Sequence, residues 1–202
     1  SNFVGLLDNV MIGRIGTEQM SGVSIVNQLL FVFNLCIFGA ISGPGIFSSQ
    51  FYGKRDHDGI RYCHRYKFVI SMIIVGVVIS VFSLFKNELI SLYLKGDQVV
   101  GDIEATKEYG RNYLQVMLIG LLPFALSQCY SGTLREMGET KIPMISGLIA
   151  VGTNLFLNWV LIYGKLGAPA LGVEGAAIAT VAAQTFSAVL SVVYIIKKYI
   201  KE

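Results

Sequence analysis

Charged residues divide the chain into long apolar stretches. The uncharged runs that are long enough to matter cover residues 19–53, 68–85, 112–134, 142–164 and 175–196. A helix rises 1.5 Å per residue, so about 20 residues cross a hydrocarbon core of roughly 30 Å. Because the bilayer offers no water to backbone N–H and C=O groups, a spanning segment is a helix or part of a closed barrel, and barrel strands show only about ten alternating residues. The pattern therefore predicts an all-α membrane protein that crosses the bilayer several times.

The same pattern, combined with its turn residues, predicts helices near 1–13, 19–51, 60–86, 102–136, 140–163 and 174–198. Residues 1–13 are apolar but too short to cross, so we interpret them as the end of a truncated helix and expect six helices in all. Residues 87–101 mix apolar and charged positions, which indicates a short interfacial helix. No internal boundary points to a second domain, so we expect residues 1–202 to form a single transmembrane domain.

The distribution of charge predicts the orientation in the membrane. Hydrophobic residues make up 53% of the chain and charged residues only 14%, so the loops hold most of the charge. Residues 54–67, residues 135–141 and the C-terminal tail carry ten basic groups, against six in the other connections. Since cytoplasmic loops collect Lys and Arg, we place these three segments in the cytoplasm.

Soluble-enzyme chemistry finds no support in the sequence. His57 and His64 are the only histidines and lie in the basic segment 54–67, which we interpret as a solvated loop, so no Ser-His-acid set can be argued. The three cysteines, Cys36, Cys63 and Cys129, lack metal-site spacing and fit small buried hydrophobes. We therefore expect no catalytic residues, no structural metal and no nucleic-acid partner.

Asp8 is the one acid that we place at membrane depth. It lies in the first helix between Leu7 and Asn9, six residues before Arg14. An ionisable residue inside a membrane is costly and faces a cavity or a partner. Two interpretations stay open: a proton or cation site inside the bundle, or an interfacial acid that pairs with Arg14.

Uncharged polar residues on other predicted helices are further candidates. Asn154 and Asn158 lie one turn apart on one helix face, where their carbonyl oxygens can bind Na⁺ or their amides can join helices. Thr180 lies on a ridge of small residues that favours close packing. We also expect a group of polar residues near glycine and proline to line a cavity. These residues are Asn27, Gln28, Asn34, Gln128 and Tyr130.

Five strings of residues resemble one family of transporters. In order, they are LLDNVMIGRIG (6–16), SSQFYGKRD (48–56), GTLREMGETKIPM (132–144), NLFLNWVLIYG (154–164) and GVEGAAIATVAAQ (172–184). Together they look like the N-terminal lobe of a multidrug and toxic compound extrusion (MATE) transporter. The resemblance covers essentially the whole chain but only about half of such a transporter, which has two six-helix lobes.

This resemblance implies a function and a site. The family exports organic, often cationic, compounds in exchange for Na⁺ or H⁺, which implies a multi-pass protein of the cell membrane, a second lobe as partner and no cofactor. In one prokaryotic subgroup a cation site uses an acid on the first helix, an Asn and an acid one turn apart on the fifth, and a Thr on the sixth. Carried over, these fall on Asp8, Asn154, Asn158 and Thr180. The second acid is Asn158 here, which removes a negative charge.

Two other functions remain as alternatives. A lipid-linked oligosaccharide flippase of the same superfamily would show Arg or Lys inside the spans to meet phosphates, and we expect none there. A membrane-embedded assembly subunit that transports nothing would need no acid at membrane depth, which Asp8 provides.

Overall fold

The computed structural model describes the backbone of residues 2–94 and 102–200 and the side chains of residues 8–94 and 102–198. Within these ranges the chain is helical apart from short connections. The α-helices are α1 (Asn2–Gly13), α2 (Thr17–Gly53), α3 (His57–Leu84), α4 (Lys86–Leu94), α5 (Ile103–Glu136), α6 (Lys141–Tyr163) and α7 (Gly172–Ile195), and a π-helix, η1 (Ile196–Ile200), continues α7.

The predicted spans are confirmed as helices. α2, α3, α5, α6 and α7 are each long and apolar enough to cross a membrane, whereas α1 has only 12 residues, or about 18 Å at 1.5 Å per residue. The interfacial segment is confirmed in part, since α4 covers Lys86–Leu94. The remainder of that prediction, residues 95–101, lies outside the described residues.

Local signals in the sequence determine where several helices begin and end. Asp56 caps α3 by accepting a hydrogen bond from the Gly59 N–H at 3.0 Å, and Asp102 caps α5 in the same way. Gly164 ends α6 in a left-handed conformation, with φ of 64°, that glycine adopts without strain. Pro44 and Pro123 lie inside α2 and α5 without ending them.

One prediction about the basic segment is wrong. Residues 57–67 form the first turns of α3 and not a solvated loop, because the Asp56 cap starts the helix at His57, three residues before the predicted start near 60. Cys63 and His64 are consequently half-buried helix residues, and Lys67 is completely buried.

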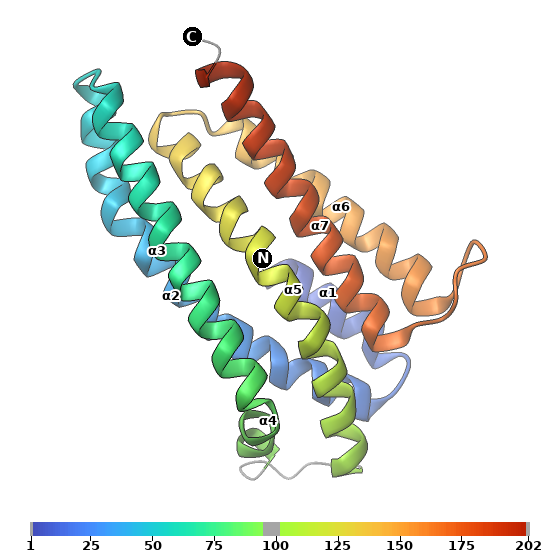
Figure 1. Cartoon of the computed structure of the whole chain (residues 1–202). Helices are drawn as coiled ribbons and strands as arrows, with labels where there is room; N and C mark the ends of the chain where they lie inside the picture. The colour runs from blue at the N-terminus through green and yellow to red at the C-terminus, as the bar shows by residue number, and fades with distance from the viewer. Residues whose placement is uncertain (1, 95–101, 201–202) are drawn as a thin grey trace.

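The helices form one bundle in which α5 lies between two groups (Figure 1). α2 and α3 pack on one side of α5, and α7 packs on the other side together with α6 and α1. α2 and α5 approach each other closely, since a Cβ on Gly22 would fall 2.8 Å from the backbone of Thr106 and Gly110. Small residues on α7, among them Ala176, Ala179 and Ala183, are buried against its neighbours, as the small-residue ridge predicts.

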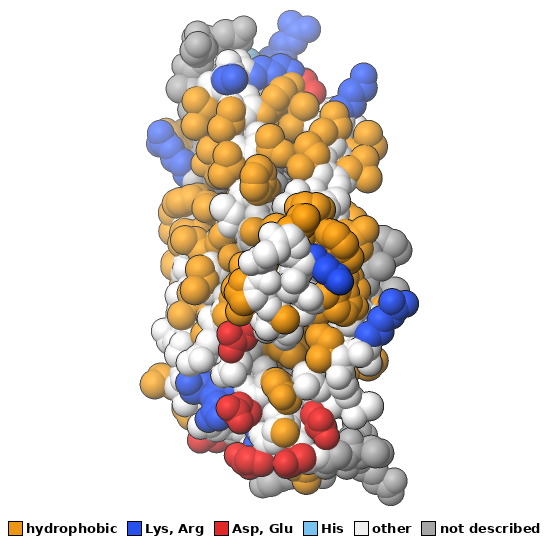
Figure 2. All heavy atoms as spheres, turned by 90° about the vertical axis from the view of Figure 1, so that its right-hand side faces the viewer, with side chains coloured by type: hydrophobic (Ala, Val, Ile, Leu, Met, Phe, Trp, Pro, Cys, Tyr) orange, Lys and Arg blue, Asp and Glu red, His pale blue; other side chains and the backbone are white. Residues whose placement is uncertain are grey.

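The surface has the charge pattern of a membrane-spanning bundle. Figure 2 shows hydrophobic side chains over the middle of one face, with most of the visible acidic side chains at its lower end. The α2–α3 and α5–α6 connections and η1 all lie at the opposite end, so the described parts of the three basic segments share one end of the bundle (Figure 1). The chain is a multi-pass membrane protein, and which end faces the cytoplasm stays a prediction.

Candidate functional site

Asp8 lies inside the bundle, where α1 meets α6 and α7. Its side chain is only 2% exposed and accepts hydrogen bonds from the Asn158 amide and, at 3.2 Å, from the Thr180 hydroxyl. In the part of the chain that the structure describes, no basic side chain forms an ion pair with Asp8, and Arg14 is exposed. The carboxyl group is therefore held by neutral donors alone.

The four residues of the predicted cation site form one hydrogen-bonded cluster. Asn158 Nδ2 also donates to Asn154 Oδ1 at 3.1 Å, and Asn154 Nδ2 donates to Thr180 Oγ1 at 3.0 Å. The one-turn spacing of the asparagines on α6 puts both amides on the face toward α7, as expected. Asp8, Asn154, Asn158 and Thr180, up to 172 positions apart in the sequence, are thus brought together.

One oxygen of this cluster lacks a donor. Asn158 Oδ1 is buried and finds no hydrogen-bond partner among the described residues. A buried carbonyl oxygen without a donor costs free energy, so most such atoms are paired with a protein group, a water molecule or an ion. The Asn158 oxygen can therefore bind a cation or accept a hydrogen bond from a protonated group.

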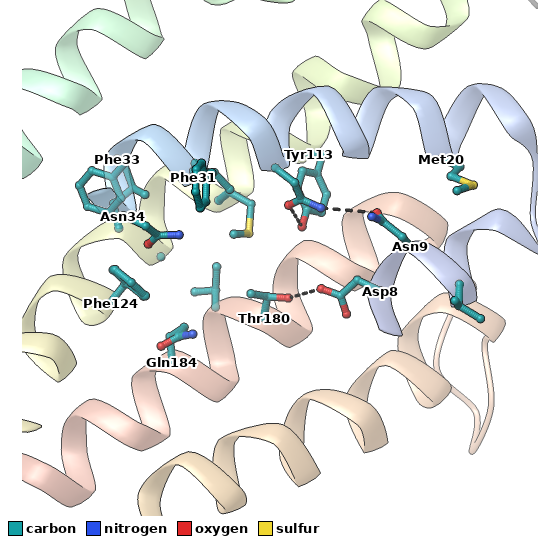
Figure 3. A pocket seen from close by; sticks show the side chains of 17 residues that line it. Asp8, Asn9, Met20, Phe31, Phe33, Asn34, Tyr113, Phe124, Thr180 and Gln184 are labelled. Carbon is teal, nitrogen blue, oxygen red and sulfur yellow. Dashed lines mark hydrogen bonds between the residues drawn. The ribbon is translucent and has the colours of Figure 1, made fainter. Parts of the chain in front are cut away.

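Two members of the cluster, Asp8 and Thr180, lie at one wall of a cavity of about 580 Å³ (Figure 3), and Asn154 and Asn158 are not among its lining residues. Asp8 and Thr180 line it together with the amides of Asn9, Asn27 and Asn34. The other main lining is aromatic or thioether: Phe31, Phe33, Tyr113, Phe124, Met20 and Met117. The volume suits a drug-sized molecule, and the lining combines apolar area with a few polar groups, as ligand cavities usually do.

The cavity contains only some of the residues predicted to line it. Asn27 and Asn34 are among the lining residues, and Asn27 contacts Asn9 and the Tyr113 hydroxyl at 3.5 Å each. Gln28, Gln128 and Tyr130 are not among them. Gln28 follows Asn27 by one residue and is exposed on another face of α2, and Tyr130 packs edge-on against His64 of α3.

Three polar lining residues, Asn9, Tyr113 and Gln184, were not predicted from the sequence. Asn9 adjoins Asp8, and Gln184 lies one turn after Thr180. Both could have been predicted from their position next to a candidate residue or on the same helix face. Tyr113 lies near the beginning of α5, and only the packing of α5 against α2 brings it to Asn27.

A second buried polar cluster joins α3 to α5. Lys67 is 0% exposed, and its Nζ donates to Glu136 Oε2 at 2.5 Å and to Thr133 Oγ1 at 2.8 Å. Lys67 follows the start of α3 by ten residues, or about 15 Å of helix. The expectation that no Lys or Arg lies within the spanning helices is therefore wrong. It failed because Lys67 was counted with the basic loop that precedes it.

Comparisons with known proteins identify the family of this chain. The MatE family model matches residues 1–160. The chain belongs to the MatE family. This confirms the resemblance and the fold class inferred from the five sequence strings.

Among curated relatives of this MatE chain, the probable multidrug resistance protein NorM of Thermotoga maritima is 29% identical over 177 residues, which are 88% of the chain and 37% of the relative. The corresponding protein of Pasteurella multocida is 28% identical over 195 residues, which are 96% of the chain and 40% of the relative. The chain spans about two fifths of the length of these relatives.

Solved structures show the same fold. A multidrug resistance MATE family transporter of the MOP superfamily in an inward-facing conformation superimposes with a TM-score of 0.85 at 20% identity, over 97% of this chain and 42% of that one. A MATE structure in a bent conformation gives a TM-score of 0.82 at 21% identity, over 98% of this chain and 41% of that one. The bundle thus has the fold of one lobe of a MATE transporter.

Proposed function

We propose that this MatE chain is one lobe of a secondary active antiporter that exports organic, often cationic, compounds in exchange for Na⁺ or H⁺. The observation that carries the proposal is a buried carboxyl group, Asp8, without a basic partner among the described residues, at the wall of a cavity of about 580 Å³. The NorM relatives are described as multidrug resistance proteins, which agrees with export of such compounds.

The chemistry of the Asp8 cluster fits a coupling ion. A buried carboxylate is costly unless a proton or a cation neutralises it. Na⁺ prefers oxygen ligands, and the oxygens of Asp8 and Thr180 lie 3.2 Å apart beside the amide of Asn158, whose own oxygen has no donor among the described residues. A proton also fits, because Asn158 can turn its amide so that the oxygen accepts from a protonated Asp8.

Coupling follows from competition for the same wall of the cavity. Asp8 both holds the coupling ion and lines the cavity, so an ion on Asp8 removes the negative charge that attracts an organic cation. A ligand shifts a conformational equilibrium only through its different affinity for the two states. Ion and substrate would then favour different shapes of the lobe, as alternating access requires.

The charges around the cavity favour a cationic substrate over a lipid phosphate. Its described lining contains an aspartate and no lysine or arginine. Lys67, the basic residue inside a span, is fully buried against Glu136 and is not among the lining residues. A flippase for phosphate-linked lipids would need basic groups in the cavity, so the described lining disfavours the flippase as an alternative function.

Two partners belong to the proposal. The lipid bilayer, which we take to be the cell membrane, surrounds the apolar spans, and a second six-helix lobe would close the pathway along the open side of the cavity, where Val10 and Phe31 are more than half exposed. Large exposed apolar patches mark membrane or protein contacts.

Transport by the full-length protein in proteoliposomes tests the proposal. A fluorescent organic cation should move against its gradient when a Na⁺ or an H⁺ gradient is imposed, and a protonophore or a Na⁺ ionophore should identify the ion. Movement that ignores both gradients would contradict ion coupling, and no movement at all would favour an assembly subunit.

A further inference from the structure

The buried ammonium of Lys67 occupies a place to which the proposed transport function assigns no role. Lys67 Nζ lies between Thr133 Oγ1 and Glu136 Oε2, two residues on one face of α5. The Thr133 hydroxyl donates to the Cys129 carbonyl at 3.0 Å and lies 3.0 Å from His64 Nδ1. Among the described residues, both polar partners of this charge thus come from α5.

The contacts next to this ion pair show a single alignment of the two helices. Lys67 meets Thr133, and one turn further along both antiparallel helices Ser71 Oγ meets Cys129 Sγ at 3.4 Å. A slide by one turn in that direction would bring the ammonium beside Gly132 and the buried Cys129, where no carboxylate side chain stands. A buried charge without its partner costs several kcal/mol, so the ion pair opposes this slide strongly.

α2 closes the same cluster from a third side. A Cβ on Gly45 would fall 2.5 Å from Glu136 Oε1, so the carboxylate rests against the backbone of α2. Removal of one partner of a buried pair is strongly destabilising, whereas an apolar pair of similar size is often tolerated. The Lys67–Glu136 charges are therefore not required for the stability of the packed helices. A role in fixing one alignment of α3 against α5 accounts for their presence.

α5 also supplies much of the cavity wall, through Tyr113, Met117, Gly120, Leu121 and Phe124. We infer that Lys67 and Glu136 are positioning residues that fix the alignment of α3 against α5 and so hold this wall in place during transport. The alignment can be measured without any transport assay, whereas its effect on transport rests on the proposed function.

Disulfide formation between α3 and α5 measures the alignment directly. In the full-length protein, Cys36 and Cys63 are replaced by Ala, and Ser71→Cys is added so that it faces the native Cys129. Mild oxidation should join the two thiols completely, because side-chain atoms at these positions already lie within contact distance. Ser80→Cys, at an exposed position of the same helix, is the matched control and should not react with Cys129.

Two changes of the ion pair then separate alignment from packing. The double replacement Lys67→Met with Glu136→Met should fold but slow disulfide formation at least about fivefold, because apolar side chains allow sliding. The exchange Lys67→Glu with Glu136→Lys should keep the original rate. An unchanged rate in the apolar variant, or a rate in the exchanged variant as slow as expected for the apolar one, would overturn the inference.

Transport by the cross-linked protein tests the functional consequence. If α3 and α5 keep one alignment, the oxidised Ser71→Cys protein should transport within about twofold of the reduced protein. Loss of transport on oxidation that a reductant reverses would show that the helices must slide, and would overturn the inference. Failure of the unmodified protein to transport any organic cation would instead contradict the proposed function and leave the disulfide rates as a separate test of the alignment.

Discussion

The two buried charged clusters of this bundle, around Asp8 and around Lys67, are similar in burial and hydrogen bonding but differ in whether a counter-charge is present. Asp8 and Lys67 are both at most 2% exposed, and each is hydrogen-bonded to a threonine. Lys67 has an opposite charge beside it, Glu136 at 2.5 Å, whereas the hydrogen-bond donors to Asp8 among the described residues are the neutral groups of Asn158 and Thr180. The charge of the Lys67 cluster is neutralised within the cluster, whereas the charge of the Asp8 cluster is neutralised only when a proton or a cation binds.

The clusters also join different helices. The Lys67 pair joins α3 to α5 and rests against α2, whereas the Asp8 hydrogen bonds join α1 to α6 and α7. A neutralised ion pair holds two helices in one arrangement, whereas a site that gains and loses a proton or cation changes the contacts between its helices. Under the proposed function, this difference assigns the fixed side of the lobe to α2, α3 and α5 and the ion-dependent side to α1, α6 and α7.

The largest expected effect is the loss of coupling on Asp8→Asn. The amide keeps the shape of the site but cannot carry a negative charge, so gradient-driven efflux should fall to the background of empty liposomes while expression stays normal. Asp58→Asn, at an acid whose side chain is 81% exposed, is the matched control and should transport as the unmodified protein does. Normal coupling in Asp8→Asn would move the coupling site elsewhere and leave Asn154, Asn158 and Thr180 as packing groups.

Glu136→Gln should have the opposite profile, with its main effect on stability. The change leaves the Lys67 ammonium buried without a counter-charge, which should lower the free energy of unfolding by about 3–5 kcal/mol. Thermal unfolding in detergent measures this, and Glu104→Gln, which breaks an exposed pair with Lys107 at 3.8 Å, should change it by less than about 1 kcal/mol. Equal losses in the two variants would remove the contrast between the clusters.

The sequence was sufficient to predict the spanning helices because apolar length is a property of each segment alone. The predicted helix near 140–163 is α6 (Lys141–Tyr163), and the helix near 102–136 is α5 (Ile103–Glu136). The start of α3 was predicted within three residues, at 60 against His57, but its basic residues, such as Arg61 and Lys67, were interpreted as part of a solvated loop. A cap at Asp56, which accepts from the Gly59 N–H, was the local signal that placed it.

The candidate site was predictable to the extent that a resemblance named its residues. Spacing alone placed Asn154 and Asn158 on one face, but it left open whether they bind an ion or pack. That Asp8 meets Thr180, 172 positions away, depends on how α1, α6 and α7 pack. The Lys67–Glu136 pair was missed for the same reason, since its partners are 69 positions apart and belong to no local pattern.

Asn158→Asp should sharpen the comparison by adding a second acid to the unbalanced cluster. Asn158 is fully buried beside Asp8, so two carboxylates would share one small site and repel each other unless a cation binds. Cation affinity should rise on the order of tenfold, which corresponds to about 1.4 kcal/mol. The Na⁺ dependence of tryptophan fluorescence or of thermal unfolding measures it, and Asn87→Asp, at an exposed position, should give no rise.

The smallest expected effect tests the balanced cluster from the side of α2. Alanine normally stabilises a helix by about 1 kcal/mol relative to glycine, and nothing lies within 4 Å of a Cβ added at Gly39 of α2, so Gly39→Ala should leave the unfolding temperature equal or higher. A Cβ at Gly45 would fall 2.5 Å from Glu136 Oε1, so Gly45→Ala must displace the carboxylate and weaken its bond to Lys67. We expect Gly45→Ala to lose about 1 kcal/mol or more relative to Gly39→Ala, with both variants measured by thermal unfolding in the same detergent. If the two alanine variants are equally stable, the carboxylate moves aside without cost, and α2 is not part of the fixed side of the lobe.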